Sequence, residues 1–119
     1  METKPKMKIL LVEDDQEIGN WIKKGIDALG NIQSFDWAGD CAQATDLLNL
    51  ALPDIVILDL KLPDGNGIDI LKHIRKTKSD TKVYVFSVNS ELERTCIRLG
   101  ANQFFDKSTD GEKLLLALS

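Results

Sequence analysis

The feature that most constrains the fold of this chain is its alternation between short strand-like runs and stretches with helical periodicity. Five runs are typical of strands in their apolar, β-branched and aromatic content; they cover residues 8–12, 33–38, 54–58, 82–87 and 103–105. Each run is followed by a stretch whose apolar residues recur every three or four positions. Strict strand–helix alternation predicts an α/β fold, a doubly wound, five-stranded parallel sheet with helices on both faces.

The helical stretches carry recognisable apolar positions and stop signals. The first and fourth are predicted to stop at Gly30-Asn31 and at Gly100, because glycine is common just after a helix. The second covers residues 42–50 and ends before Pro53. The apolar positions of the other four are, in chain order, Ile18, Trp21, Ile22, Ile26 and Leu29; Ile68, Leu71 and Ile74; Leu92, Cys96 and Leu99; and Leu114, Leu115 and Leu118.

Composition and charge exclude several classes of protein. With 119 residues, 43% hydrophobic and 29% charged, we expect one domain over residues 1–119, of which 1–6 form a loose N-terminal segment. The net charge of -4 argues against a general nucleic-acid binder. No stretch is apolar enough to span a membrane or to act as a signal peptide, so we expect a cytoplasmic protein. Cys41 and Cys96 lack metal-ligand spacing and are expected to be buried thiols.

The polar residues that point to a function stand where the predicted strands end. In an open parallel sheet, ligands bind beyond the carboxyl ends of the strands. Four of the five strands deliver polar groups there, namely Asp14, Asp15, Asp59, Ser87 and Lys107. Each has an ordinary structural interpretation, such as a helix cap, the start of a turn or a solvated lysine. Their coincidence at four strand ends favours a shared site.

This set of groups suits metal-assisted phosphoryl transfer. The carboxylates of Asp14, Asp15 and Asp59 are hard oxygen ligands of the kind that Mg²⁺ prefers, and an ion among them would remove their mutual repulsion. Lys107 would neutralise further charge, and the Ser87 hydroxyl would donate to a phosphoryl oxygen. A carboxylate can itself accept a phosphoryl group as an aspartyl phosphate. Asp59 is the expected acceptor, because it follows a central strand and precedes a glycine-rich loop.

At this point the sequence resembles the receiver domain of the two-component response-regulator family. Four segments carry the resemblance, which spans almost the whole chain: VEDDQE at 12–17, VILDLKLPDGNGID at 56–69, FSVNS at 86–90 and LGANQFFDKS at 99–108. The resemblance implies a flavodoxin-like sheet and phosphorylation of Asp59. It also implies Mg²⁺ held by Asp14, Asp15, Asp59 and the backbone carbonyl of Lys61. Ser87 and Lys107 would contact the phosphoryl group.

The same resemblance implies a switch and its regulation. Phosphorylation would draw Ser87 inward, and Phe104 would turn to fill the space behind it. Phe104 lacks the hydroxyl or imidazole that is common at this position, and the bulky Val88 replaces a frequent alanine. Ser108 stands where a proline is common. Lys61 and Asn89 occupy positions that flank the path of the hydrolysing water, and they are expected to influence the lifetime of the phosphorylated state.

The implied partners follow from the same family. A histidine kinase or a histidine phosphotransfer protein would supply the phosphoryl group, and the chain would catalyse its own phosphorylation and dephosphorylation without being a conventional turnover enzyme. An effector would read the face formed by the fourth helix, fifth strand and fifth helix, where Leu92, Phe104 and Leu115 are either surface or core. We expect no direct nucleic-acid or membrane binding, and a monomer or a phosphorylation-dependent dimer.

Three alternatives carry less weight. A non-phosphorylated pseudo-receiver would act as a binding module, but it would usually lack an acidic residue or the lysine, and none is lost here. A flavodoxin-like carrier of FMN needs a phosphate cradle after the first strand, and the segment EDDQE has the wrong charge. A phosphatase with an aspartyl-phosphate intermediate would have a second aspartate two residues after the nucleophile, where Lys61 stands.

Overall fold

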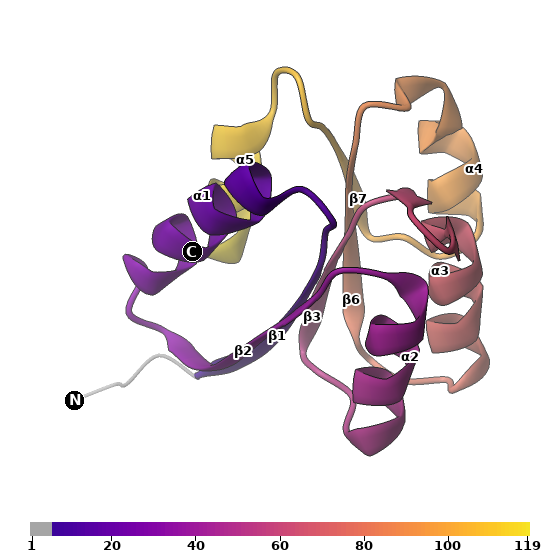
Figure 1. The fold of residues 1–119 in the computed structure, drawn as a ribbon, viewed down its shortest axis with the longest axis horizontal. Coiled ribbons are helices and arrows are strands. Elements are labelled where there is room, and N and C mark those ends of the chain that lie inside the picture. The colour runs from indigo at the N-terminus through magenta and orange to yellow at the C-terminus, as the bar shows by residue number, and fades with distance from the viewer. Residues whose placement is uncertain (1–5) are drawn as a thin grey trace.

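A five-stranded parallel sheet forms the middle layer of the protein, as the sequence predicts. The computed structural model describes residues 6–119 (Figure 1). Residues 1–5 of the predicted loose segment lie outside the described residues, and Lys6 is exposed. The strand order is β2-β1-β3-β6-β7. The strands are β1 (Met7–Val12), β2 (Ile32–Ala38), β3 (Ile55–Leu58), β6 (Lys82–Ser87) and β7 (Gln103–Asp106).

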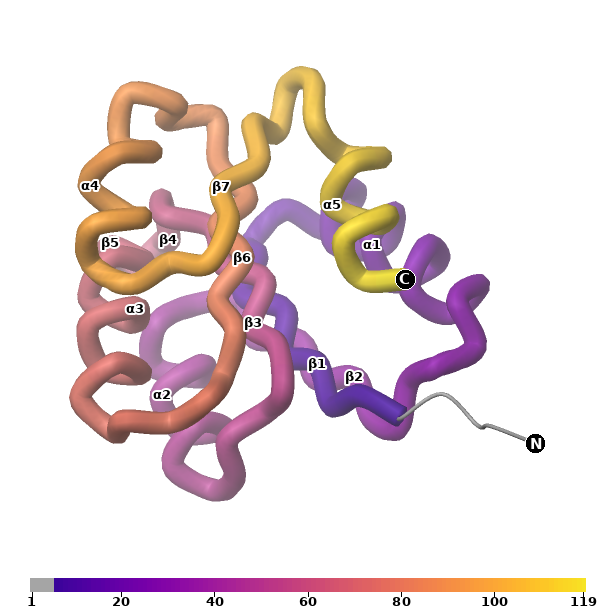
Figure 2. Tube along the Cα trace, turned by 180° about the vertical axis from the view of Figure 1, so that it is seen from behind, coloured from indigo at the N-terminus to yellow at the C-terminus, as the bar shows by residue number. Residues whose placement is uncertain are grey.

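Helices cover both faces of the sheet, which makes the fold doubly wound. Figures 1 and 2 show α1 (Gln16–Asp27) and α5 (Gly111–Leu118) together on one face. The other face carries α2 (Cys41–Leu50), α3 (Gly67–Lys76) and α4 (Glu93–Arg98), with the 3-10 turn η1 (Ser90–Leu92) before α4. A two-stranded hairpin, β4 (Lys61–Leu62) and β5 (Gly65–Asn66), follows β3 and was not predicted.

Alternate residues of the central strands pack into two separate hydrophobic cores, one on each face of the sheet. In β1, Ile9 and Leu11 pack with the buried side chains of α1 and α5, whereas Leu10 and Val12 pack with those of α2, α3 and α4. Burial on both faces explains why the central strands form continuous apolar runs in the sequence rather than alternating ones. Truncating one of these side chains to alanine would cost about 2–5 kcal/mol.

The predicted helix stops are confirmed. Gly30 and Gly100, which follow α1 and α4, both have positive φ, of 72° and 110°. Glycine adopts this conformation without the steric cost that other residues meet. No helix within residues 6–119 is long and apolar enough to cross a membrane.

Two predicted buried residues lie nearer the surface. Trp21 is 44% exposed rather than on the buried face of α1 with Ile22 and Ile26. Its indole covers the start of α5, where a Cβ at Gly111 would lie 2.9 Å from Trp21 Cη2, so the ring fills the rim of the helix pair and not the core. Cys96 is buried as predicted, but Cys41 is only half-buried at the start of α2.

Candidate functional site

The strand register brings the predicted site residues to one end of the sheet. Val12 of β1 pairs with Leu58 of β3, so the residues that follow these two strands emerge at the same level. Backbone bonds continue the alignment, with Asp59 N donating to Val12 O at 3.0 Å and Lys107 N donating to Ser87 O at 3.1 Å. The ends of β1, β3, β6 and β7 therefore share one edge, as expected for a ligand site in a parallel sheet.

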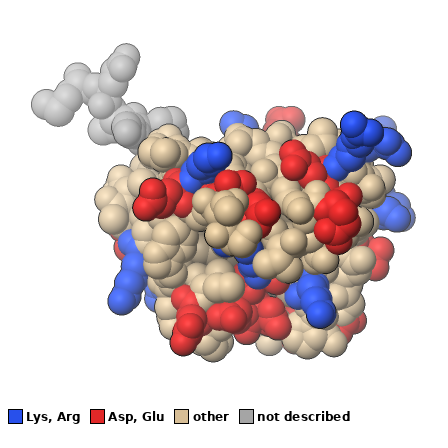
Figure 3. Space-filling model, turned by 90° about the horizontal axis from the view of Figure 1, so that it is seen from above, with Lys and Arg blue, Asp and Glu red and all other residues tan. Residues whose placement is uncertain are grey.

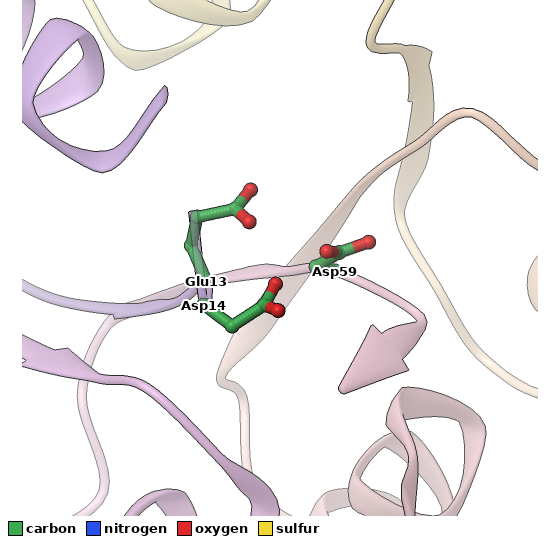
Figure 4. Close-up of side chains that lie close together, drawn as sticks. All are labelled: Glu13, Asp14 and Asp59. Atoms are coloured by element: carbon green, nitrogen blue, oxygen red, sulfur yellow. The ribbon is translucent and has the colours of Figure 1, made fainter. Parts of the chain in front are cut away.

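Three carboxylates form a cluster at this edge. Glu13, Asp14 and Asp59 each offer one oxygen, and these oxygens all lie within 4.8 Å of one another. Figure 4 shows Glu13 and Asp14 leaving the end of β1 and Asp59 leaving the neighbouring strand, with the carboxylates of Glu13 and Asp14 extending toward the side on which Asp59 lies. Glu13 and Asp59 are buried, whereas Asp14 is exposed. Such a set of hard oxygen donors, partly open to solvent, fits a divalent ion such as Mg²⁺.

An open pocket of about 580 Å³ lies over the cluster. Its walls include Lys61, Leu62 and Pro63 from the hairpin that follows Asp59, and Val88, which is 62% exposed, from the segment after β6. Figure 3 looks down on this end of the molecule and shows acidic side chains spread widely over the surface, with basic side chains between them. The pocket is thus reachable from solvent while its floor is buried.

Lys107 is the cation at the floor of the pocket. Its Nζ lies 2.7 Å from Glu13 Oε1 and 2.8 Å from Asp59 Oδ2, and its side chain is only 10% exposed. Both acceptors are themselves buried. Ion pairs of this kind need good geometry to offset the loss of hydration. One ammonium group therefore joins the ends of β1, β3 and β7, but it cannot balance three carboxylates.

The electrostatics of the cluster are set by burial and by this shared lysine. Burial raises the pKa of Glu13 from 4.5 to about 7; the hydrogen bond from Lys107 opposes this rise, and the charge of Asp59 adds to it. For Lys107, burial by itself lowers the pKa, but the hydrogen bonds to Asp59 and Glu13 raise it overall. Negative charge at Glu13 is thus costly without a further cation, which is the situation that a metal ion relieves.

The structure places Glu13 inside the carboxylate cluster and Asp15, a predicted ligand, outside it. Asp15 caps α1, where its Oδ1 accepts from Ile18 N at 3.0 Å. Glu13 instead continues the alternation of β1 beyond Ile9 and Leu11, turns toward the floor of the pocket, and accepts from Asp15 N at 3.1 Å. Its position directly after a buried strand is a signal of burial that the sequence carried.

The other predicted site residues lie close to the pocket but take different positions. Ser87 is fully buried, and its hydroxyl accepts from Asn89 N at 3.1 Å and donates to Asn89 Oδ1 at 3.4 Å. Lys61 is exposed, and its backbone N–H donates to Asp59 Oδ1 at 3.4 Å. Phe104 is half-buried and packs into the core beneath α4. The peptide bond between Lys107 and Ser108 is trans.

The loop after Asp59 is held at both ends by close contacts. The carboxylate of Asp64 accepts from Cys41 N at 2.7 Å and from Ala42 N at 3.0 Å, and so caps α2 from the hairpin. The bond from Cys41 N, in particular, lowers the pKa of Asp64. At the other end, a Cβ at Gly67 would lie only 2.2 Å from Asp59 O, so this close approach of α3 requires glycine.

The face formed by α4, β7 and α5, which is predicted to contact an effector, has both partly buried and exposed apolar residues. Leu92, Phe104 and Leu115 are partly buried and pack against the two cores. The exposed apolar side chains of α4 and α5 are instead Ile97, at 45%, and Leu116, at 72%.

The comparisons with known proteins agree with this arrangement. The family model of the response regulator receiver domain matches residues 9–119. The transcriptional regulatory protein QseB of Escherichia coli O157:H7 is 39% identical over 85% of this chain, and CpxR of Escherichia coli K12 is 36% identical over 91%. The non-phosphorylated HemR receiver domain from Leptospira biflexa superposes with a TM-score of 0.83 and 32% identity, covering 97% of this chain and 91% of that one.

The match covers nearly all of the HemR receiver domain but only part of each transcriptional regulator. The chain spans 46% of the length of both QseB and CpxR, so it corresponds to about half of each regulator. What those whole proteins do therefore does not transfer directly to the residues described here.

Proposed function

Because this chain belongs to the response regulator receiver domain family, we propose that it is a phosphorylation-dependent signalling receiver in which Asp59 accepts the phosphoryl group. The observation that carries the proposal is the sharing of Lys107 between buried Glu13 and Asp59 at the floor of an open acidic pocket. An ordinary structural ion pair does not need a third carboxylate nearby, nor a solvent-filled approach to it.

The two oxygens of Asp59 are suited to different tasks. Oδ2 accepts from Lys107 at 2.8 Å, whereas Oδ1 accepts only a long bond, of 3.4 Å, from Lys61 N. Oδ1 is therefore the better placed nucleophile. It forms the new bond to phosphorus, and the bond from phosphorus to the donor atom breaks, with its electron pair leaving on the donor. Lys107 stabilises the negative charge of the carboxylate and of the phosphoryl oxygens during this transfer.

Glu13, Asp14 and Asp59, with the backbone carbonyl of Lys61, would hold Mg²⁺, which would supply charge neutralisation for the phosphoryl oxygens. Glu13 takes the place predicted for Asp15, because its carboxylate lies within the cluster. The open pocket over these residues would leave room for the waters that Mg²⁺ usually keeps.

Ser87 would act after the phosphoryl group has arrived. Its hydroxyl now bonds to Asn89, so contact with a phosphoryl oxygen requires the segment after β6 to rearrange. Phe104 packs against the core cluster that includes Cys96 of α4, and its movement would pass the change to the surface. Lys61 and Asn89 flank the acceptor and the hydroxyl, where they would influence how fast water reaches the phosphorylated state.

The partners follow from the chemistry and from the family. A cytoplasmic histidine kinase or histidine phosphotransfer protein would be the donor, and the face formed by α4, β7 and α5 would contact an effector or a second copy of the chain. The exposed Ile97 and Leu116 are the apolar groups that such a contact would cover.

The test is the intact mass of the protein after incubation with acetyl phosphate, with and without Mg²⁺. We expect a phosphoryl adduct on the wild type that requires Mg²⁺ and is absent from Asp59→Asn. The matched control is Asp54→Asn, which removes a carboxylate at the opposite end of the same strand, where it accepts from Lys8 N; it should still form the adduct. If neither acetyl phosphate nor beryllofluoride binds the wild type, the chain is a pseudo-receiver that acts through binding alone.

A further inference from the structure

A side chain from β2 holds the turn that carries two of the three clustered carboxylates. The indole Nε1 of Trp37 donates to the backbone carbonyl of Glu13 at 2.8 Å. Trp37 pairs with Leu11 in the β1–β2 register, so its side chain extends past the end of β1 to reach this carbonyl. The contact joins residues that are 24 positions apart in the sequence.

The carbonyl in question controls the direction of both carboxylates. It belongs to the peptide group that links Glu13 to Asp14, and a peptide group is planar and rigid. The angles ψ of Glu13 and φ of Asp14 define the orientation of that plane, and a change in either angle alone turns the side chain of one residue relative to that of the other. A hydrogen bond that fixes the plane therefore fixes how the carboxylates of Glu13 and Asp14 face Asp59.

Gly19 makes room for the indole. A Cβ at Gly19 would lie 1.9 Å from Trp37 Cζ2, which no real structure tolerates, so the ring lies directly on the backbone of α1. Gly19 is buried and stands inside a helix, where glycine costs about 1 kcal/mol relative to alanine. The helix carries this cost at the one position where the ring of Trp37 requires it.

We propose that Trp37, seated on Gly19, is a positioning residue that orients the carboxylates of Glu13 and Asp14 for the divalent ion and the incoming phosphoryl group. This inference rests on the proposed function of the site and adds to it a residue outside the acidic pocket. Trp37 touches neither the ion nor the phosphoryl group, and acts through the peptide group between the two acids.

The experiment measures Mg²⁺ binding directly, by titration of the phosphate-free protein with MgCl₂, alongside acetyl phosphate labelling. Trp37→Phe keeps an aromatic ring but removes the donor, and we expect it to raise the Mg²⁺ Kd about 3- to 10-fold, which is the effect of losing one hydrogen bond. The matched control is Trp21→Phe, the same change at an exposed tryptophan, which should stay within about twofold of the wild type.

Gly19→Ala tests the contact between the Trp37 ring and the backbone of α1. In the wild type it should displace the indole and weaken Mg²⁺ binding to a similar extent. In the Trp37→Phe background the same substitution should add less than about twofold, because residues that act through one contact are not additive. The Trp37 indole N–H signal in ¹H–¹⁵N spectra should also shift on Mg²⁺ addition, which packing alone would not produce.

The outcomes distinguish the role of Trp37 from the proposed function of the site. If the wild type binds Mg²⁺ and forms the adduct but Trp37→Phe has an unchanged Kd, the role of Trp37 is refuted and the proposed function stands. A loss of stability in Trp37→Phe with an unchanged Kd also refutes that role, because it assigns the residue to packing alone. If the wild type neither binds Mg²⁺ nor accepts phosphate, the proposed function itself fails, and the positioning role with it.

Discussion

Two cations link distant parts of this chain, one at each end of the sheet, and their hydrogen-bond acceptors differ in charge. Arg75 extends from α3 to the amino-terminal ends of β6 and β7. Its three donor nitrogens each meet a neutral acceptor at 2.8 or 2.9 Å, namely the carbonyls of Gly100 and Thr81 and the side-chain Oδ1 of Asn102. The fork of the guanidinium fits these positions, and no carboxylate within residues 6–119 is involved.

Lys107, at the carboxyl-terminal ends of the strands, has the opposite environment. It donates to two buried carboxylates, with a third one nearby. The charge of the acceptors distinguishes a purely structural contact from a binding site for a cation. Each donor nitrogen of Arg75 has a neutral acceptor, so the guanidinium links elements of the fold without gathering negative charge, whereas the carboxylates around Lys107 retain excess negative charge. Only the second arrangement gains stability from another cation.

The largest expected effect is on the stability of variants that lack one of the two cations, measured with and without Mg²⁺. Lys107→Met leaves clustered carboxylates without a counter-charge, and we expect it to lower the free energy of unfolding by about 3 kcal/mol at pH 8. Arg75→Met should cost about 2 kcal/mol through lost hydrogen bonds. Added Mg²⁺ should narrow the difference in unfolding free energy between the wild type and Lys107→Met, but it should leave the difference between the wild type and Arg75→Met unchanged, as measured by urea unfolding. A difference for Lys107→Met that does not change with Mg²⁺ would contradict this prediction.

The second prediction concerns pH in the metal-free protein. The pKa of Glu13 is raised from 4.5 to about 7, so between these values the folded state holds more protons than the unfolded state. The stability that Glu13 contributes is therefore fully present below pH 4.5 and is lost as the pH rises through 7. We expect the difference in unfolding free energy between wild type and Glu13→Gln to change by about 3 kcal/mol across this range.

One further variant and added Mg²⁺ check the pH prediction. Arg75→Met should keep the same pH dependence as the wild type, because no carboxylate contacts that guanidinium in the part of the chain that the structure describes. Saturating Mg²⁺ should flatten the dependence, since the ion favours ionised Glu13. A pH profile of Glu13→Gln identical to that of the wild type would rule out Glu13 as the titrating group.

A third prediction sharpens the assignment of the acids at the end of β1. Asp14→Asn removes a charged ligand and should raise the Mg²⁺ Kd about tenfold, measured by calorimetric titration. Asp15→Asn is the matched control, because asparagine is also a good N-cap and the side chain lies outside the cluster. Its Kd should stay within about twofold of the wild type. The reverse order of effects would return Asp15 to the ligand set that the sequence suggested.

The smallest expected effect comes from placing a carboxylate beside Arg75, so that the cation at the amino-terminal ends of the strands has an acidic partner as Lys107 does. Asn102→Asp would give Arg75 a carboxylate partner while keeping the acceptor for Val83 N, which now donates to Asn102 Oδ1 at 2.8 Å. Because the pair is partly exposed, the stability should change by less than about 1 kcal/mol. Mg²⁺ should not affect the melting temperature of this variant more than that of the wild type. A new Mg²⁺ response would show that one carboxylate beside a cation suffices for a site.

Much of the fold could be predicted because it depends on local patterns. The strand predicted at 82–87 matches β6, and the other four differ from the observed strands by one residue at an end. Periodicity failed where a side chain had an alternative to the core, as for Trp21, which covers the start of α5. The β4–β5 hairpin was missed because its strands are two residues long, too short to show any periodicity.

The sequence by itself determined which strands form, that they are parallel, and that acids, a hydroxyl and a lysine follow their ends. These properties depend on periodicity and on the residue types at strand ends, both of which are local. Only the tertiary structure decided that Glu13 and not Asp15 joins Asp59, that Lys107 is shared by two carboxylates, and that Trp37 reaches the turn. Alternation along β1 indicates that Glu13 is buried, but which groups meet depends on the course of the turn and on the register of neighbouring strands, and neither is a local property.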